Sequence, residues 1–546
     1  MENEDSSKTN RRQFLQLTAA GSLALLGKQA WAIDKVATSG LVTGQREAAE
    51  VGTRILAGGG NAVDAAVAAA LVAGIVSPSN CGVGGYGGHM VIGWPGGKVT
   101  AIDFNSAAPA AARENMFPVD RQGRVRGAIN QHGWLAVGVP GTLAGLQLAL
   151  DKFGTRGLGQ LVEPAIRFAR DGIKIDAGLA RVIQVSVAQF QRDPASARLF
   201  CPTGKPLLEG QKLRNRDLAA LFDTLATENS VNSFYHGEVA DHIARDFKKH
   251  GGILAKRDLA EYSAREVVPT ALEWRGMTMY TAPLTAGGLT VLQAIGTLKA
   301  LEWQDMDQVD PKTTHAAIEA LRVAWHDRLT LLGDPQGSEV PVARLLSADY
   351  AHEAAERVSK VVSQERLIVG TTDGRPAGGT IHLSAVDKSG LMVALTLTHG
   401  EGFGARVTVD GLGIVLGHGM SRFDPVPGHP NSVRPKCRPL NNMCPTIVFR
   451  GDQPIVALGA TGGRRIPNTM FSVLQALVGR GLALPEAYAV PRLHTEGDVK
   501  LQLAKGWSEA EVAYLKRVGY TIQDGQGANL NAISRDPQAG ELAHVP

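Results

Sequence analysis

The residues best suited to chemistry are Gly378-Gly379-Thr380, where a threonine follows two glycines at the start of an expected strand. If the chain were cut before Thr380, that residue would carry both a hydroxyl and a free α-amine. A hydroxyl is a weak nucleophile at its ordinary pKa, whereas an α-amine titrates near roughly 7.7 to 8 and can accept the hydroxyl proton around neutral pH. Nucleophile and base would then belong to one residue. Taken alone, Gly-Gly-Thr is more often a turn that leads into a strand.

The elements around Thr380 are predicted from the periodicity of apolar residues. After it, residues 381–387 and 392–398 alternate apolar and polar types around Lys388-Ser389-Gly390, which favours a hairpin. Before it, helices are expected with few strands, and Asn61 is a good N-cap for an alanine-rich helix. The C-terminal part should be richer in strands. The predicted helices are 62–75, 142–152, 160–171, 289–301 and 313–331, and one strand is expected at 89–94.

Other motifs point away from cofactors and metals. The glycine-rich stretch 82–88 lacks the Gly-Lys-Ser/Thr ending of a phosphate loop, so it is interpreted as close-packed turns. The four cysteines, at positions 81, 201, 437 and 444, form no framework, and no CxxC or HExxH spacing indicates a metal. At least two should be buried free thiols, while a disulfide, with Cys437 and Cys444 the closest pair, stays open. No cofactor and no metal are expected.

Composition indicates a large globular protein. The chain has 546 residues, of which 44% are hydrophobic, and its 64 glycines are spread along the sequence. It is long enough for two or three domains, although a single large unit is also compatible with the length. The formal charge is +4, and no basic run is interleaved with aromatic residues, so nucleic acid is not an expected partner.

The N-terminus has the features of an export signal. Arg11 and Arg12 precede an apolar stretch at residues 14–27, and Ala30-Trp31-Ala32 offers a small-residue cleavage site. This stretch is shorter than the roughly 20 apolar residues needed to span a bilayer. Residues 1–32 are therefore predicted to be a twin-arginine signal peptide, which places the mature protein in a bacterial periplasm and not in the membrane. An amphipathic first helix is the alternative.

Blocks spread over nearly the whole chain after residue 35 resemble the γ-glutamyltransferase family, whose members are self-cleaving hydrolases with an N-terminal threonine. The resemblance implies an α+β fold, a four-layer αββα sandwich. It also implies cleavage into a large piece, 33–379, and a small piece, 380–546, which stay together as a heterodimer. The blocks are 58–66 (GGGNAVDAA), 137–141 (VGVPG), 163–166 (EPAI), 285–288 (TAGG), 315–327, 333–335 (GDP), 380–398, 402–404 (GFG), 438–446 (RPLNNMCPT), 459–463 (GATGG) and 491–494 (PRLH).

The same resemblance assigns catalytic roles. Thr380 matches the nucleophile, which attacks an amide to form an acyl-enzyme that is released to water or to an amine. Thr398 matches a second threonine that supports the nucleophile. Gly462 and Gly463 match the glycines whose backbone N–H groups bind the oxyanion, a role suited to residues without a Cβ. The Thr380 hydroxyl should first attack the Gly379 carbonyl, so that the chain matures without a protease.

The recognition residues depart from the family pattern. Asn105 stands where relatives have an arginine that holds the substrate α-carboxylate, and Arg422 stands where they have an aspartate that holds the α-amine. An ammonium group beside Arg422 would be repelled. The other departures lie around the same pocket: Gly400 and Gly419 replace an asparagine and a glutamine, and Asn441 and Asn442 replace two serines.

If Arg422 faces the pocket, it favours an anionic acyl group without an α-amine, of the glutaryl or oxamate kind. Alternatively it points to solvent or pairs with Asp424 or Glu401. The stretch from Arg422 to Arg438 is shorter than in relatives with a lid, so a bulky leaving group could fit. His382 is interpreted as structural, whereas His399 and His418 could contribute to the altered pocket.

Three hypotheses remain. The first is a periplasmic amidohydrolase or acyltransferase with altered acyl specificity, acting on a small-molecule amide. The second is a true γ-glutamyl transpeptidase or glutathione hydrolase in which other residues replace the missing ligands. The third is a catalytically silent homologue, which would show neither maturation nor cleavage of an amide.

Overall fold

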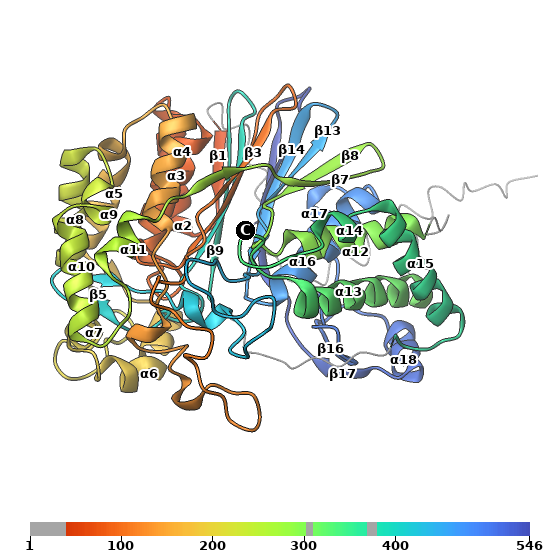
Figure 1. Cartoon of the computed structure of the whole chain (residues 1–546). Helices are drawn as coiled ribbons and strands as arrows, with labels where there is room; N and C mark the ends of the chain where they lie inside the picture. Colours follow the sequence, from red (N-terminus) through yellow and green to blue (C-terminus); the bar gives the residue numbers. More distant parts are fainter. Residues whose placement is uncertain (1–39, 302–309, 369–378, 546) are drawn as a thin grey trace, which may run out of the picture. The chain divides into compact units, whose positions relative to one another are not determined.

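The structure is a computed structural model that describes residues 40–301, 310–368 and 379–545. The described part of the chain contains two six-stranded antiparallel sheets, which lie between two groups of helices (Figure 1). The predicted signal peptide, residues 1–32, lies outside the described residues. So do residues 369–378, near the end of the predicted large piece, whereas Gly379 and Thr380 are described.

The first sheet holds the candidate nucleophile at one end of a strand near its centre. β9 and β10 form the hairpin that the sequence predicts, with both strands at the expected bounds. Thr380 directly precedes β9 and Thr398 ends β10, so the hairpin brings these two threonines to the same edge. In spatial order the strands are β1 (Gly40–Thr43), β9 (Ile381–Asp387), β10 (Met392–Thr398), β2 (Gly87–Gly93), β3 (Val99–Asp103) and β6 (Arg265–Val267).

The second sheet carries the glycines predicted to bind the oxyanion. Its longest strand, β14, ends at Thr461, directly before Gly462 and Gly463. All of its strand pairs are antiparallel, and the register of β13 with β14 shifts between Val448 and Phe449. In spatial order the strands are β19 (Leu542–Val545), β18 (Asn529–Arg535), β14 (Gln453–Thr461), β13 (Thr446–Arg450), β8 (Met277–Thr281) and β7 (Thr270–Trp274).

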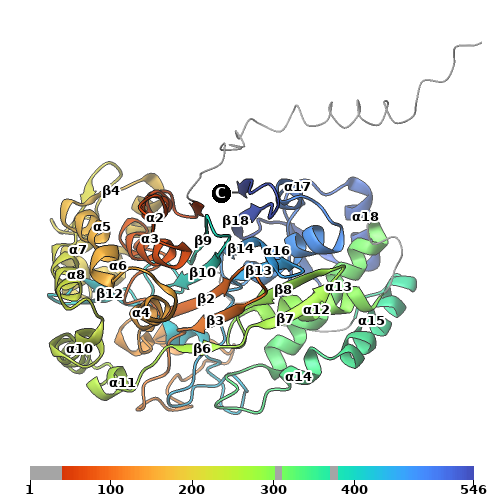
Figure 2. The same cartoon turned by 90° about the horizontal axis from the view of Figure 1, so that it is seen from above.

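Apolar side chains from the two sheets meet in a shared core. Ala394 and Val386 of the first sheet belong to the same buried cluster as Ala457, Ile447 and Ile533 of the second. Strand β9 contacts both β14 and β18, and β10 contacts β14. Seen from above in Figure 2, the two sheets lie next to each other with helices on their outer sides. This packing holds the edge with the two threonines against the end of β14.

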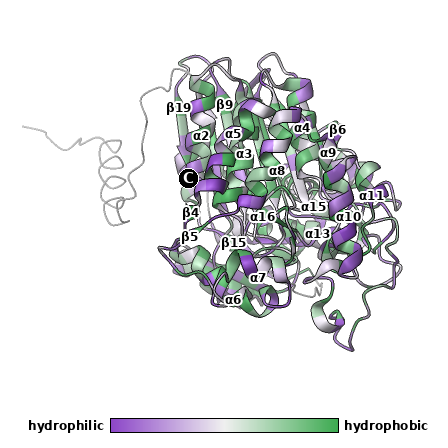
Figure 3. Ribbon diagram, turned by 90° about the vertical axis from the view of Figure 1, so that its left-hand side faces the viewer, coloured by the Kyte–Doolittle hydropathy of each residue, from purple (hydrophilic) through white to green (hydrophobic). Residues whose placement is uncertain are grey.

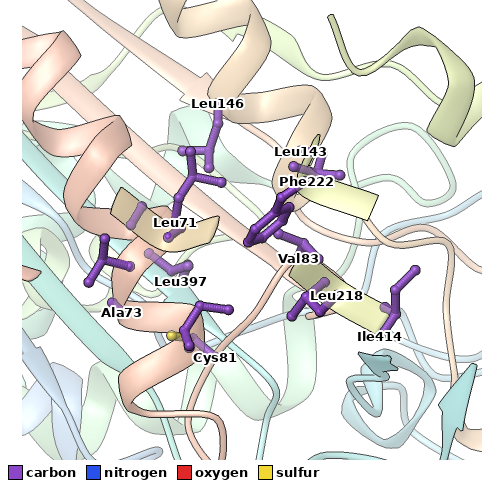
Figure 4. Packing of buried hydrophobic residues seen from close by; sticks show 14 of the residues in the cluster. Leu71, Ala73, Cys81, Val83, Leu143, Leu146, Leu218, Phe222, Leu397 and Ile414 are labelled. Atoms are coloured by element: carbon purple, nitrogen blue, oxygen red, sulfur yellow. The ribbon is translucent and has the colours of Figure 1, made fainter. Parts of the chain in front are cut away.

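A helical layer packs on the outer side of the first sheet. α3 is almost entirely buried, and its alanines let neighbouring elements approach closely. Figure 4 shows Leu71 and Ala73 of this helix within the buried cluster that also holds Leu146 and Leu397. As predicted, Asn61 caps this helix, accepting hydrogen bonds from the backbone N–H groups of Val63 and Asp64 at 3.0 Å each. The main helices on this side are α2 (Arg46–Ala57), α3 (Ala62–Val76), α4 (Thr142–Phe153), α5 (Leu158–Asp171), α6 (Ala177–Phe190), α7 (Pro194–Phe200), α8 (Arg216–Glu228), α10 (Glu238–Lys249) and α11 (Lys256–Ala260).

The outer helices of this layer are amphipathic. In α10 the buried apolar residues Val239, Ile243 and Phe247 recur every four positions, which is the spacing of one helix face. Figure 3 shows hydrophilic and hydrophobic residues alternating along α5, α8 and α10. Burial of one face, and not helix propensity alone, therefore fixes these helices on the core.

A second group of helices packs on the outer side of the second sheet. Val291, Ile318 and Trp325 from these helices join Val456 and Leu458 of the sheet in one buried cluster. A three-stranded sheet, β15 (Leu493–His494), β16 (Lys500–Leu503) and β17 (Thr521–Asp524), adds to this side. The helices are α12 (Gly288–Ala300), α13 (Pro311–Leu331), α15 (Ala348–Ser363), α16 (Arg465–Leu474), α17 (Leu484–Ala489) and α18 (Glu509–Val518).

Before Thr380 the structure has helices where the sequence predicts them, but it has more strands than expected. Helices were expected at 142–152 and 313–331, and the structure has them at Thr142–Phe153 and Pro311–Leu331. The two main sheets, however, take β1, β2, β3, β6, β7 and β8 from this part of the chain. Both sheets therefore combine strands from before and after Thr380. All four cysteines are free, and three of them are buried.

Candidate active site

Thr380 sits at the mouth of β9 with its hydroxyl already in a hydrogen bond. Its side chain is 8% exposed, and Oγ1 donates to Thr398 Oγ1 at 3.1 Å. Thr398 in turn donates to the carbonyl oxygen of Gly379, the residue before the predicted cleavage point. The hydroxyl of Thr398 therefore touches both the candidate nucleophile and the carbonyl that the nucleophile would attack.

Thr398 uses every hydrogen-bonding position of its hydroxyl. It accepts a second hydrogen bond from the backbone N–H of Gly400 at 2.8 Å. A threonine hydroxyl has one proton to donate and two lone pairs, so one donated and two accepted bonds fix its orientation. The Thr398 proton thus points at the Gly379 carbonyl, and the Thr380 proton points at Thr398.

Gly462 and Gly463 form the turn between β14 and α16. Both have positive φ angles, 141° and 64°, in the region that glycine adopts most readily. Among the described residues, no acceptor is found for the backbone N–H of either glycine. The turn also lies at the N-terminus of a ten-residue helix, where the helix dipole favours negative charge. These two N–H groups are available for an oxyanion.

Contacts between the sheets indicate how this turn lies relative to Thr380. The Ser384 hydroxyl donates to the Ala457 carbonyl at 3.2 Å, and a Cβ on Gly459 would lie 2.3 Å from the ring of His382. Ser384 thus lies beside Ala457 and His382 beside Gly459, so moving two residues forward along β14 corresponds to moving two residues back along β9. Because side chains on one face of a strand recur every two residues, the next step sets Thr461 beside Thr380. Gly462 follows immediately.

The side chain of His382 is hydrogen-bonded to groups other than Thr380. Its ring nitrogens are hydrogen-bonded to Thr396 Oγ1 at 2.7 Å and to Ser384 Oγ at 3.1 Å. Burial lowers its pKa to about 3, so it is neutral at neutral pH. Burial likewise lowers the pKa of His399 to about 3, and neither ring bonds to Thr380. The prediction that His382 is structural agrees with this placement.

Arg422 lines a cavity of about 720 Å³. Its Nη2 donates to Nε2 of His418 at 3.4 Å, and His418 donates from Nδ1 to the Gln131 carbonyl at 3.1 Å. Burial, followed by the charge of Arg422, lowers the pKa of His418 well below its usual value, which keeps the ring neutral. In the described part of the chain Arg422 pairs with neither Asp424 nor Glu401, although both line the same cavity. Its Nε is buried without a partner.

The two asparagines of the RPLNNM block have different environments. Asn442 lines the cavity, and its Oδ1 accepts a hydrogen bond from Arg328 at 3.3 Å. Asn441 is 1% exposed, donates to His89 Nε2 at 2.9 Å and accepts from the Met443 N–H at 3.0 Å. Asn442 can therefore reach a ligand in the cavity, whereas the Asn441 side chain is used within the protein.

The other three predicted recognition residues are buried and do not line the cavity. Asn105 donates to Thr285 Oγ1 at 2.6 Å and to the Pro439 carbonyl at 2.7 Å. A Cβ on Gly400 would lie 2.1 Å from the ring of His418, and one on Gly419 would lie 2.2 Å from the Ser106 hydroxyl. The space next to Gly400 is thus filled by the histidine that holds Arg422.

Two arginines next to predicted site residues line the cavity, and the sequence analysis did not single them out. Arg328 on α13 is 3% exposed, and Arg464 directly follows the Gly462-Gly463 turn and pairs with Glu496. Both line the cavity with Arg422. Arg328 interrupts the buried stripe that Leu321 and Trp325 form along the helix. A charged residue at an apolar position of a predicted helix was the signal that could have found it.

The described residues contain no group of three or more His, Cys, Asp or Glu side chains placed to hold a metal ion. Within these same residues no helix is both long and apolar enough to cross a membrane.

Comparison with known proteins identifies the family. The chain is 34% identical to the glutathione hydrolase proenzyme of Pseudomonas sp. (strain A14), over 84% of this chain and 81% of that protein. It is 30% identical to the acylase ACY 1 proenzyme of Pseudomonas sp. (strain SE83), over 91% and 90% of the two chains. The crystal structure of cephalosporin acylase from Bacillus halodurans matches with a TM-score of 0.83 at 27% identity, covering 95% of this chain and 97% of that one. The gamma-glutamyltranspeptidase family model matches residues 48–545, and the chain belongs to this family of N-terminal-nucleophile hydrolases.

Proposed function

We propose that this family amidohydrolase is a proenzyme that cuts itself before Thr380 and then uses Thr380 as its nucleophile. The observation that carries the proposal is the hydrogen-bonded chain from Thr380 through Thr398 to the Gly379 carbonyl. A nucleophile and the carbonyl that it attacks are both bound to one hydroxyl, so little movement is needed to bring them together. The relatives described as proenzymes support the same reading.

Maturation follows from this arrangement. Thr380 Oγ1 attacks the Gly379 carbonyl carbon, and its proton passes through the Thr398 hydroxyl to the nitrogen of Thr380 as the C–N bond breaks. The developing oxyanion is stabilised by nearby donors, of which Thr398 is one. An ester then joins Gly379 to Thr380 Oγ1. Water hydrolyses this ester and leaves a carboxylate on Gly379 and a free hydroxyl and α-amine on Thr380.

Turnover repeats the chemistry on a substrate amide. The free α-amine of Thr380 accepts the hydroxyl proton while Oγ1 attacks the amide carbonyl, and the leaving amine then takes that proton. The N–H groups of Gly462 and Gly463 stabilise the oxyanion, since they lack other acceptors and sit at a helix N-terminus. Water, or an acceptor amine, releases the acyl group from Thr380.

The fold is assigned to the four-layer αββα sandwich of the family, with residues 33–379 and 380–546 as large and small subunits. Two stacked sheets with helices on their outer sides support this assignment. Each sheet contains strands from both pieces, which pair at β1–β9 and β10–β2 in the first sheet and at β13–β8 in the second, and cleavage before Thr380 would leave every strand pair in place. This interleaving supports a stable heterodimer.

The acyl group is proposed to be anionic, as in a glutaryl or oxamate amide. Arg422 lines the cavity, and its positive charge suits a carboxylate and repels an ammonium group. The similarity to proteins named as acylases supports this specificity. True γ-glutamyl transfer is the second candidate, because the identity to glutathione hydrolases is as high as 34%. Two anilides distinguish the candidates. Faster cleavage of a glutaryl anilide would support the anionic acyl specificity, and faster cleavage of a γ-glutamyl anilide would support γ-glutamyl transfer.

Export to a periplasm remains part of the proposal. It is supported by the paired arginines, the short apolar stretch and the small-residue site within residues 1–32. Fractionation of cells that express the full chain, followed by N-terminal sequencing, would show the mature protein beginning at Ile33.

The first experiment is mass spectrometry and N-terminal sequencing of the purified protein and of Thr380→Ala. The wild type should give a fragment that begins at Thr380, and the variant should stay intact. A wild-type chain that stays whole, with no activity on either anilide, would indicate a catalytically silent homologue. Cleavage of Thr380→Ala at the same bond would assign maturation to another nucleophile.

A further inference from the structure

Arg328 is a buried cation without a counter-charge. It is 3% exposed, and its Nη2 donates to the Asn441 carbonyl at 2.6 Å and to Asn442 Oδ1 at 3.3 Å. In the described chain no carboxylate pairs with it. Burial lowers its pKa to about 10, which leaves it charged at neutral pH. A buried charge with only neutral partners is costly, so its presence in a cavity wall requires an explanation.

Five arginines line this cavity, and the three besides Arg328 and Arg422 are either paired with a carboxylate or exposed to solvent. Arg124 pairs with Asp120 at 3.1 Å, and Arg464 pairs with Glu496. Arg422, like Arg328, has no carboxylate partner among the described residues. Arg126 also lines the cavity but is exposed to solvent. Among the described residues, Arg328 and Arg422 are therefore the cavity arginines that are at least partly buried and have no paired carboxylate.

Arg328 and Arg422 both line this one cavity. Burial raises the pKa of the Tyr86 hydroxyl, and the charges of Arg422 and Arg328 both oppose this rise, so the two charges act on one buried group. His418 accepts a hydrogen bond from Nη2 of Arg422. Asn442 accepts one from Arg328 and also lines the cavity. One anionic ligand could therefore contact both guanidinium groups.

We propose that Arg328 and Arg422 together bind an acyl group that carries two negative charges. This inference rests on the proposed function. It specifies the substrate as an amide of a polycarboxylic acid in which two carboxylates remain free. Arg422 and Arg328 each take one carboxylate. Bound substrate supplies the counter-charge that the protein lacks, so affinity and stability are gained together.

The test compares two anilides with matched chains. The mono-anilide of glutaric acid leaves one free carboxylate, and the terminal mono-anilide of propane-1,2,3-tricarboxylic acid leaves two on the same carbon chain. Wild-type kcat/KM should be higher for the diacid by about tenfold. Arg328→Gln should lower the ratio of kcat/KM for the diacid to kcat/KM for the monoacid by about 10- to 100-fold. An equal loss for both anilides, or no loss, overturns the proposal.

Thermal unfolding gives a second readout with a matched control. Arg322 lies on the same helix, is 2% exposed and is paired with Glu319. Arg322→Gln should lower Tm by several degrees because it leaves Glu319 buried and unpaired, whereas Arg328→Gln should keep Tm within about 2 °C or raise it. A fall in Tm as large as that of Arg322→Gln would make Arg328 a structural residue and contradict the proposal.

Binding of the free acid separates this inference from the proposed function. Propane-1,2,3-tricarboxylate should raise the Tm of the wild type and not that of Arg328→Gln. If neither anilide is cleaved but this shift occurs, the proposed reaction fails and the dianion site stands. If glutaryl anilide is cleaved but the tricarboxylate gives no shift, the reaction stands and the dianion site is wrong.

Discussion

At the scale of single residues, the chemistry depends on one hydroxyl that has two partners. The Thr398 hydroxyl accepts a hydrogen bond from Thr380 and donates one to the carbonyl oxygen of Gly379. We expect Thr398→Ala to slow self-cleavage by about 100-fold, since removal of one donor to an oxyanion commonly costs this much. The rate is measured from the loss of full-length chain on a denaturing gel.

Thr398→Ser is the matched control for this effect, because it keeps the hydroxyl and loses only a methyl group. It should mature within about tenfold of the wild-type rate. If Thr398→Ala matured as fast as Thr398→Ser, the hydroxyl would have no part in the attack on Gly379.

At the scale of the elements, the turn that follows β10 connects the candidate nucleophile to the cavity, because Gly400 contacts both Thr398 and the histidine that binds Arg422. Gly400 has a φ of 104°, donates to Thr398, and leaves no room for a Cβ beside the ring of His418. We expect Gly400→Ala to displace His418, and with it Arg422, and to lower kcat/KM for the glutaryl anilide by about 100-fold. Steady-state kinetics on the processed enzyme would measure it.

Gly428 provides the comparison, because its φ is 86° but a Cβ there would meet nothing within 4 Å. Gly428→Ala carries a similar backbone strain without the collision, so it should lower Tm slightly and leave kcat/KM unchanged. Equal kinetic losses in both variants would mean that backbone strain, and not the position of His418, controls the site.

Elements predicted well from the sequence are those whose pattern is local. The β9–β10 hairpin was fixed by alternation around Lys388-Ser389-Gly390, and α3 by its cap at Asn61. Strands β7 and β8 were not predicted because they belong to the sheet through the pairing of β8 with β13, which is far away in sequence, and β7 pairs only with β8. The orientation of Arg422 escaped for the same reason: it is set by His418 and Gln131, whose meeting depends on the tertiary fold.

At the scale of the whole molecule, buried histidines make stability depend on pH. Burial lowers the pKa of His382 and His399 to about 3 and that of His89 to about 4. Below pH about 6.5 the unfolded chain therefore binds more protons than the folded one, so stability falls as the pH falls from about 6.5 toward 4. Each of the three should cost up to about 2 kcal/mol at pH 5. Thermal unfolding between pH 7.5 and about 5 measures the slope.

The slope should come from the buried rings and not from histidine content. His352 is exposed on α15, so His352→Gln should leave the dependence of Tm on pH unchanged. His382→Gln should reduce it, even though it lowers Tm at every pH by removing bonds to Thr396 and Ser384. A Tm that stays constant from pH 7.5 to about 5 would show that these histidines are accessible to protons in the folded state.

A buried ion pair joins three segments of the chain and should help to hold the two proposed pieces together after cleavage. Glu319 and Arg322 of α13 are 0% and 2% exposed. Together they bind both backbone groups of Ile368: the Ile368 N–H donates to Glu319 at 3.0 Å, and Arg322 donates to its carbonyl at 2.8 Å. Arg322 also donates to the Asp498 carbonyl at 3.0 Å, and Tyr520 donates to Glu319. The pair thus links the large piece to the C-terminal residues of the small one.

Glu319→Ala would leave Arg322 buried without its partner, a loss of about 3 to 5 kcal/mol. We expect the matured variant to release its small piece at a lower urea concentration than the wild type, as measured by size-exclusion chromatography. The exposed pair of Arg46 and Glu50 is the control, and Glu50→Ala should not change the release. Release of the Glu319→Ala small piece at the wild-type urea concentration would mean that the interleaved strands alone hold the two pieces together, and that the ion pair serves only to fix Ile368.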